Sequence, residues 1–354
     1  MSALFSPLTI RSVILRNRIV VSPMCEYSSV DGFANDWHMV HLGSRAVGGA
    51  AAVITEATAV TADGRISPED LGIWKDEHVE MLARIFAFVA SQGAVPGVQL
   101  AHAGRKASTA APWRGRGNVP VDRGGWTPIY GPSPIGFVPD YQTPAALDAE
   151  GIADVVTAFR DGARRVLDAG GQIIEIHAAH GYLLNSFLSP LSNQRDDQYG
   201  GSFENRTRIV REVVSAVRQV WPHSLPLFIR ISATDWTDGG WTGEDSVALA
   251  RQLKPLGVDV VDCSSGGNVP RATIPAGPGY QVRFAEQVKR EAGILTAAVG
   301  MITDARQAEE IVSSGQADLV LLARQFLRDP YWPLTAAKEL GTEPPVPVQY
   351  LRAF

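Results

Sequence analysis

The segment His177-Ala-Ala-His180-Gly-Tyr182 brings two imidazoles and a phenol together directly after an apolar run. Two histidines at this spacing could bind a metal ion or donate two hydrogen bonds to one oxygen atom. A metal site usually needs a third ligand, and the segment has neither an HExxH pattern nor a nearby cysteine. Two N–H donors would lower the cost of negative charge on a substrate oxygen, and Tyr182 could deliver a proton. The segment therefore favours a catalytic site, with a metal site and a purely structural histidine pair as the alternatives.

Other apolar runs of the chain also end in residues that could bind a ligand. Arg230 ends one of them, and an arginine in such a place needs an anionic or acceptor partner. Gly300 and the pair Ala323-Arg324 follow the last two runs, where close backbone approach and a forked guanidinium could bind phosphate. A flavin would supply the partner of Arg230, because its reduced form carries negative charge over the pyrimidine edge, to which Arg230 and Gln99 could donate.

These residues can form one site only in a fold that brings the ends of many strands together. Eight short apolar, β-branched runs recur along the chain, most of them separated by stretches with helical periodicity, which predicts βα units around a parallel sheet. The runs are 18–22, 51–55, 96–100, 173–177, 226–231, 258–263, 295–299 and 317–322, and helices are expected at 153–169, 207–220, 245–256, 281–291 and 304–314. The pattern predicts an α/β fold, a (β/α)8 TIM barrel, with its active site at the carboxyl ends of the strands.

Two regions depart from this repeat. Residues 103–144, after the third strand, are rich in Gly, Pro, Trp and Arg, and long insertions of this kind are usually lids or binding loops. The tail 343–354, EPPVPVQYLRAF, has prolines whose spacing favours an extended path. No linker divides the chain, so we expect a single domain over residues 1–354.

The composition fits an ordinary globular protein. The chain has 354 residues, 45% of them hydrophobic and 19% charged, enough for a large core. A formal net charge of −5 without runs of Lys or Arg offers no electrostatic footprint for nucleic acid or an anionic membrane. The N-terminal segment lacks the apolar core of a signal peptide, and Cys25 and Cys263 are too few for a disulfide framework. We therefore expect a cytoplasmic protein.

Five longer motifs occur in order along the chain. They are Asn17-Arg-Ile-Val-Val-Ser-Pro-Met-Cys25, Gln99-Leu-Ala-His-Ala-Gly-Arg-Lys106, Glu175-Ile-His-Ala-Ala-His-Gly-Tyr182, Tyr199-Gly-Gly-Ser-Phe-Glu-Asn-Arg206 and Pro347-Val-Gln-Tyr-Leu-Arg352. With these motifs the chain resembles the old yellow enzyme family of flavin mononucleotide (FMN)-dependent ene-reductases, in particular the branch of thermophilic-like and xenobiotic reductases. The resemblance covers essentially the whole chain.

The resemblance implies a role for each candidate residue. His177 and His180 would bind the activating group of the substrate, where another branch of the family has His and Asn, and Tyr182 would be the proton donor. Tyr27 and Lys106 would lie on the substrate side, and Arg352 would reach into the active site of a neighbouring subunit, which implies a homodimer or a dimer-based tetramer. The flavin would contact Ser22, Pro23, Met24, Cys25, Ala57, Gln99 and Arg230 with its ring, and Gly300, Ala323 and Arg324 with its phosphate.

The function that this resemblance implies is reduction of the C=C bond of activated alkenes, such as α,β-unsaturated carbonyl or nitro compounds. NADPH, or NADH, would reduce FMN and leave before the alkene binds, which gives ping-pong kinetics. An alternative is a flavin-binding redox sensor that acts through Cys25. Relatives with an iron–sulfur cluster, such as dienoyl-CoA reductases, are excluded by the cysteine content and the length. Two residues depart from the family pattern: Glu26 next to the cysteine, and Ala323 in place of a common glycine.

Overall fold

Eight parallel strands form a closed barrel in a computed structural model of the protein, which describes residues 2–115 and 117–353. They follow one another around the barrel in chain order: β3 (Ile19–Val21), β4 (Ala52–Ala59), β5 (Val95–Ala101), β8 (Ile173–Ala178), β9 (Leu227–Ser232), β10 (Val260–Ser264), β11 (Leu295–Val299) and β12 (Leu319–Leu322). Every strand lies at one of the eight apolar runs. The expected (β/α)8 TIM barrel is confirmed.

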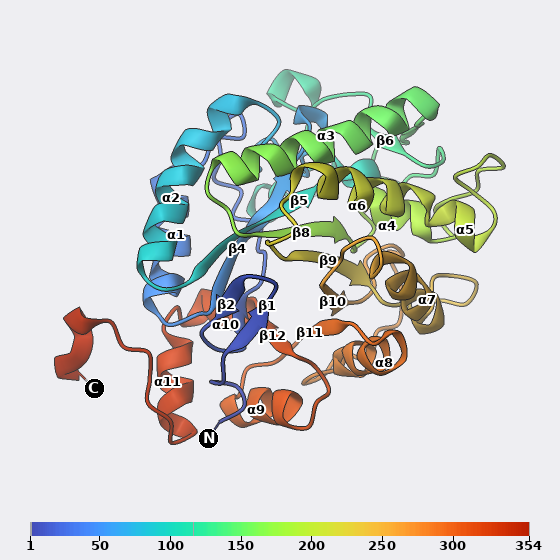
Figure 1. The fold of residues 1–354 in the computed structure, drawn as a ribbon. Coiled ribbons are helices and arrows are strands. Elements are labelled where there is room, and N and C mark those ends of the chain that lie inside the picture. Colours follow the sequence, from blue (N-terminus) through green and yellow to red (C-terminus); the bar gives the residue numbers. More distant parts are fainter. Residues whose placement is uncertain (1, 116, 354) are drawn as a thin grey trace.

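Helices cover the outside of the barrel (Figure 1). The main ones are α1 (Asp36–Val47), α2 (Val79–Ser91), α3 (Ala149–Asp168), α6 (Arg208–Val220), α7 (Gly243–Leu253), α8 (Val282–Ala292), α9 (Ala305–Ser313) and α11 (Trp332–Glu339), with the shorter α4 (Leu183–Leu188), α5 (Phe203–Arg206) and α10 (Arg324–Arg328). Helices α3, α6, α7, α8 and α9 were expected from their periodicity. Helices α1, α2 and α11 were missed. In α1, the buried face mixes His38, His41 and Arg45 with Leu42 and Ala46, which interrupts its apolar stripe.

A short antiparallel hairpin of β1 (Leu8–Ile10) and β2 (Val13–Leu15) lies across one end of the barrel (Figure 1). Ile10, Val13 and Leu15 pack on a cluster of inward-facing residues near the starts of the strands, among them Val20 and Phe228. Burying a large apolar side chain of this kind contributes about 1.5–3 kcal/mol. The hairpin therefore closes the amino-terminal end of the barrel and leaves the carboxyl ends of the strands for a ligand.

The two segments that depart from the repeat contain little regular structure. Segment 103–144 has the 3-10 turns η3 (Gly104–Lys106), η4 (Pro112–Arg114) and η5 (Val121–Arg123), and its strand β6 (Tyr130–Gly131) pairs with β7 (Ala145–Ala146). The expected extended path of the tail is wrong from residue 348 onward, where η6 (Val348–Ala353) forms. It forms because no proline follows Pro347, so the backbone N–H of Tyr350 can donate to the Pro347 carbonyl at 2.8 Å.

No helix among residues 2–115 and 117–353 is both long and apolar enough to cross a lipid bilayer.

Candidate active site

The three candidate catalytic residues lie together at the end of β8. The His177 ring meets the His180 ring edge-on, with centroids 5.1 Å apart, and meets the Tyr182 ring in the same way at 5.0 Å. His177 is buried inside the barrel wall, whereas His180 and Tyr182 are only partly buried. The spacing that singled out this segment in the sequence therefore corresponds to one cluster in space.

Hydrogen bonds define which ring nitrogens of the histidines remain for a ligand. The backbone N–H of Ala179 donates to His177 Nδ1 at 3.2 Å, so the proton of the neutral ring is on Nε2. His180 Nε2 lies 2.7 Å from Ser264 Oγ. Burial, the neighbouring His180 and Arg230 hold the pKa of His177 well below its usual range, and burial, Arg230 and Lys106 lower the pKa of His180 to about 3. Both imidazoles are therefore neutral donors near pH 7.

The backbone around His180 is held in an unusual conformation by three other loops. His180 has φ of 61°, a left-handed conformation that costs a non-glycine residue free energy. Its N–H donates to Ser232 Oγ at 2.8 Å, and Lys106 Nζ donates to its carbonyl at 2.6 Å and also to the Gly267 carbonyl. A Cβ at Gly181 would lie 2.4 Å from the Gly267 carbonyl oxygen, so only glycine allows this approach. These contacts fix the position of the histidine pair.

Lys106 has a structural contact that the sequence did not indicate. Besides its two carbonyl acceptors, its Nζ lies 3.9 Å from the centre of the Phe137 ring, in segment 103–144. Burial, and then the charge of Arg105, lower the pKa of Lys106 to about 7. Its ammonium group therefore already donates to two backbone carbonyls, which leaves fewer donors for the substrate contact that the resemblance implies.

Cys25 and Tyr27 follow β3 and lie beside the catalytic cluster. Cys25 and Tyr182 pack against the same small apolar cluster, which includes Ala57 after a bulge in β4. The Tyr27 ring meets Trp113 edge-on, with centroids 5.4 Å apart, so segment 103–144 contacts this side of the site. Burial, with Asp70 and Glu56 adding to it, raises the pKa of the Cys25 thiol well above its usual value. Cys25 is therefore a thiol rather than a thiolate.

Five buried polar residues form a layer across the barrel at the level where the apolar core ends. We call Ser22, Gln99, Glu175, Arg230 and Asp262 the polar layer. Strand register places Gln99 beside Glu175, and Arg230 beside Asp262. Gln99 Nε2 donates to Glu175 Oε1 at 2.7 Å, Arg230 Nη2 donates to Ser22 Oγ at 2.9 Å, and Arg230 Nε donates to Asp262. Arg230 therefore has the anionic partners that we expected for an arginine at the end of an apolar run.

Sequence reasoning missed Glu175 and Asp262. The signal was present, because each is a charged residue inside an otherwise apolar run, as Arg230 is. Ser232 and Ser264, which hold His180, gave no such signal, because serine is common at strand ends.

The three candidate phosphate-binding residues line one pocket. Gly300, Ala323 and Arg324 surround a hollow of about 260 Å³ at the ends of β11 and β12, together with Arg328. Gly300 has φ of 116°, and a Cβ there would lie 2.5 Å from Gln281 Nε2. Backbone is therefore exposed to the pocket at a position where a side chain would not fit, beside two guanidinium groups. Such a pocket suits a phosphate group.

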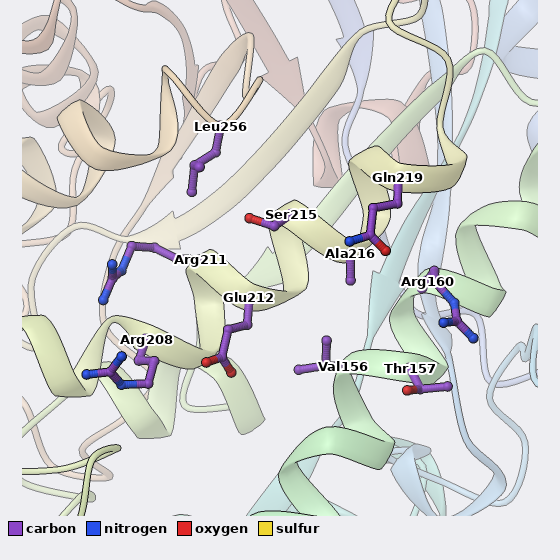
Figure 2. Close-up of a pocket in the computed structure, with 10 residues that line it drawn as sticks. All are labelled: Val156, Thr157, Arg160, Arg208, Arg211, Glu212, Ser215, Ala216, Gln219 and Leu256. Atoms are coloured by element: carbon purple, nitrogen blue, oxygen red, sulfur yellow. The ribbon is translucent and has the colours of Figure 1, made fainter.

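A separate pocket of about 550 Å³ lies on the outer surface between α3 and α6 (Figure 2). Arg160 from α3 and Arg208, Arg211 and Glu212 from α6 line it. None of the strand-end residues contributes to this pocket, so we do not assign the active site there.

Arg352 is the one candidate that a single chain does not bring to the strand ends. It lies exposed in η6, which projects from the body of the molecule (Figure 1). Among the described ranges 2–115 and 117–353, no three His, Cys, Asp or Glu side chains are grouped closely enough to hold a metal ion.

Comparison with known proteins identifies the family. Residues 3–343 match the family described as "NADH:flavin oxidoreductase / NADH oxidase family". The chain belongs to this family.

Relatives of the chain within the NADH:flavin oxidoreductase family include two bacterial proteins named NADPH dehydrogenase. The one from Geobacillus sp. (strain WCH70) is 52% identical over 99% of this chain and 98% of its own length. The one from Bacillus subtilis (strain 168) is 49% identical over 99% of both. Among solved structures, morphinone reductase is similar with a TM-score of 0.81 and 26% identity, covering 97% of this chain and 91% of its own. These similarities confirm the expected old yellow enzyme family and an NADPH-dependent enzyme.

The residues present fit the cofactor of the NADH:flavin oxidoreductase family. The pocket at Gly300 and Arg324 suits the phosphate of FMN. Arg230 uses Nε and Nη2 within the polar layer, and no hydrogen bond from its Nη1 to a described residue is found, so this donor remains for a ring. A morphinone reductase structure contains a tetrahydro form of NAD, at 27% identity and a TM-score of 0.78 over 96% of this chain and 91% of its own. The protein is an FMN-dependent oxidoreductase that uses a nicotinamide cosubstrate.

Proposed function

We propose that the protein is an ene-reductase that reduces the C=C bond of activated alkenes, such as α,β-unsaturated carbonyl or nitro compounds. The observation that carries this proposal is the cluster of two neutral imidazole donors and one protonated phenol at the end of β8. When bound, FMN supplies a hydride that it has accepted from NADPH or NADH. The two cosubstrates then use one pocket in turn, which gives ping-pong kinetics.

The histidines bind the oxygen of the activating group. His177 offers its Nε2 hydrogen, because Nδ1 is occupied by the Ala179 N–H. If Ser264 donates to His180 Nε2, the neutral ring carries its hydrogen on Nδ1, and this second donor can reach the same oxygen. Neutral donors are suited to this task over a wide pH range. Each donor contributes on the order of 3 kcal/mol to stabilisation of the developing negative charge.

Tyr182 donates the proton that completes the saturated product. Burial, with Cys25 and Tyr27 adding to it, raises the pKa of Tyr182 well above its usual value, so the phenol keeps its proton until the substrate takes it. The contact between the Tyr182 and His177 rings holds the phenol next to the residue that binds the activating group, where it can protonate the α-carbon of the substrate.

Two groups of residues would hold FMN. Its ring would contact Ser22, Pro23, Met24, Cys25, Ala57, Gln99 and Arg230, and its phosphate would contact Gly300, Ala323 and Arg324. The buried guanidinium of Arg230 supports this orientation, since it offers a donor to the edge that becomes negative on reduction. The contact of Tyr27 with Trp113, and of Lys106 with Phe137, supports segment 103–144 as a wall of the substrate pocket.

A second subunit completes this pocket in our proposal. The exposed tail carries Val348 and Leu351, which are 76% and 59% exposed, next to Arg352. A homodimer, or a tetramer built from two such dimers, would bury these apolar groups and bring Arg352 to the substrate of its neighbour. We further propose that the enzyme works in the cytoplasm.

The test is consumption of NADPH by the FMN-loaded protein, without oxygen, in the presence of cyclohexenone. We expect sustained turnover with one cyclohexanone formed per NADPH. A flavin-binding sensor would consume NADPH only once per flavin. The protonated Cys25 thiol supports the enzyme over the sensor, because redox-sensing cysteines need a lowered pKa. Absence of cyclohexanone would contradict the proposal.

A further inference from the structure

Two carboxyl groups in the polar layer each have one oxygen that no donor reaches. Glu175 Oε2 and Asp262 Oδ1 are buried and have no hydrogen-bond partner among the described residues. Their other oxygens are used, since Glu175 Oε1 accepts from Gln99 at 2.7 Å and Asp262 Oδ2 accepts from Arg230. Both side chains are fully buried, at 0% exposed. A buried acceptor left without a donor costs on the order of 1–3 kcal/mol, and more when it is charged.

One proton would satisfy both oxygens. Both carboxyl groups lie at the Arg230 guanidinium, with Glu175 Oε1 3.5 Å from Nε and Asp262 Oδ2 bound to it, and each affects the pKa of the other. A hydrogen bond between two carboxyl groups requires that one of them carries a proton. With both ionised, the layer would hold two negative charges and only the positive charge of Arg230, in a dry interior. With one proton, the layer is neutral.

The proton is on Glu175 rather than on Asp262. Burial raises the pKa of Glu175 to about 8, against the opposing charge of Arg230 and with the help of Asp262. Burial also raises the pKa of Asp262, but the Arg230 guanidinium binds the Asp262 carboxylate directly and favours its ionised form. Glu175 lies farther from that guanidinium, with Oε1 3.5 Å from Arg230 Nε. Two buried carboxyl groups that share a proton titrate as a pair.

We propose that Glu175 holds this proton, donates it to Asp262, and so sets the charge of the polar layer against the bound flavin. The proposal rests on the flavin position given above, in which Arg230 and Gln99 contact the ring. Glu175 and Asp262 are then positioning residues that act on the flavin through Gln99 and Arg230. They determine how readily the flavin accepts electrons.

Reduction of the flavin should change the protonation of this pair. Two electrons from NADPH place negative charge next to Arg230, and this charge increases the affinity of Glu175 for a proton. Above about pH 8, where Glu175 is mostly ionised in the oxidised protein, reduction should therefore draw up to one extra proton from solvent onto Glu175. The groups that face the pair are Gln99 from β5, Arg230 from β9 and Ser22 beyond β3. The charge of Arg230 in turn acts on His177 and His180, which are neutral.

The experiment is a measurement of the midpoint reduction potential of the FMN-loaded protein from about pH 6 to about pH 10. In the natural protein, the slope of the potential against pH should double above about pH 8, as the proton count per two electrons rises from one to two. Glu175→Gln keeps the volume of the side chain and donates to Asp262 through its amide. Its potential should match the natural protein near pH 6 and follow the single slope throughout.

Thr296→Val is the matched control. Thr296 is fully buried in β11, and its hydroxyl has no hydrogen-bond partner among the described residues, but it lies outside the polar layer. This variant should show the same change of slope as the natural protein. An extra proton uptake that persists in Glu175→Gln would overturn the proposal.

A second measurement needs no variant. Infrared difference spectra of the natural protein, recorded on reduction above pH 8, should show a gain of the C=O band of a protonated carboxyl group. A single slope and no such band, in a protein that binds FMN and reduces cyclohexenone, contradict this inference and leave the proposed function intact. Failure to bind FMN or to form cyclohexanone counts against the proposed function instead.

Discussion

At the scale of single residues, chemistry follows from protonation and hydrogen bonding more than from residue type. His177 and His180 were recognisable in the sequence, but their neutral state follows from burial and from Arg230 and Lys106 nearby. Lys106 was recognisable as polar, yet its ammonium group binds two backbone carbonyls. Such partners come from distant parts of the chain, so a single sequence does not reveal them.

Loss of His177 should weaken binding of the oxygen atom in the pocket. In His177→Ala, phenols that bind over oxidised flavin should bind about tenfold less tightly or worse, since a lost donor to a charged oxygen is worth about 1.5–3 kcal/mol. The long-wavelength charge-transfer band of the phenol complex measures this affinity. His223→Ala, in a loop away from the strand ends, serves as the control. Unchanged phenol affinity in His177→Ala would remove this residue from substrate binding.

The low pKa of His180 should make folding sensitive to acid. The folded protein resists protonation of His180 down to about pH 3, whereas an unfolded chain binds the proton near pH 6.5. Between these values the unfolded state binds more protons, so stability should fall as pH falls, by up to about 1.4 kcal/mol per pH unit from this group.

His180→Asn removes this titration and keeps a hydrogen-bond donor. The stability difference between the variant and the natural protein should therefore shift in favour of the variant as pH falls from 6.5 to 4. Urea unfolding at a series of pH values measures it. A difference that stays constant over this range would show that His180 is not held neutral by the fold.

At the scale of elements, the sequence pattern predicts the strands of the barrel better than it predicts the arrangement of the site. All eight barrel strands were predictable because strands buried on both faces are continuously apolar. Helix α1 was not predicted, since its inner face mixes His38, His41 and Arg45 with Leu42 and Ala46, which interrupts the apolar period. The polar layer was predicted only in part. Arg230 and Gln99 were identified, but the pairing of Glu175 with Asp262 depends on the register of β8, β9 and β10.

The turn after β11 should tolerate only glycine if it holds a phosphate. In Gly300→Ala the new Cβ would meet Gln281 Nε2 at 2.5 Å, and the backbone would be strained at φ of 116°. Strain of this kind costs about 1–3 kcal/mol, so FMN should bind about tenfold more weakly or worse. Quenching of FMN fluorescence measures the affinity.

Gly315→Ala is the matched control for backbone strain. Gly315 also has a positive φ, of 81°, but a Cβ there would meet nothing within 4 Å. This variant should be somewhat less stable and bind FMN normally. If both variants bind FMN as tightly as the natural protein, Gly300 does not form part of the phosphate site.

At the scale of the whole molecule, the barrel brings most candidate residues to the carboxyl ends of its strands, but the tail projects from the body of the molecule. Tyr350 packs against Tyr331 with ring centroids 6.1 Å apart, and the rest of η6 is exposed. The position of Arg352 within a single chain therefore does not explain a role in the active site. An active site shared between subunits would explain the exposed apolar groups and the charge at the end of the tail.

Arg352→Ala should raise the KM for the alkene about tenfold, a loss of ~1.4 kcal/mol, and leave flavin reduction by NADPH unchanged. Gln349→Ala, on the same exposed tail, should change neither the KM for the alkene nor the rate of flavin reduction. Co-expression of Arg352→Ala with Tyr182→Phe tests the sharing directly, because a mixed dimer regains one site with both residues. No recovery of activity in the purified mixed dimer would place Arg352 outside the neighbouring site.

The most direct test of the ene-reductase mechanism separates the two half-reactions of Tyr182→Phe by rapid mixing without oxygen. NADPH should reduce the flavin of the variant at nearly the natural rate, because that step needs no proton from Tyr182. Reoxidation by cyclohexenone should be slower by about 100-fold or more, the usual contribution of a general acid. Tyr199→Phe, which loses only a hydrogen bond to Glu212 away from the strand ends, should leave both steps unchanged. Equal slowing of both half-reactions in Tyr182→Phe, or slowing of neither, would contradict the assignment of Tyr182 as the proton donor.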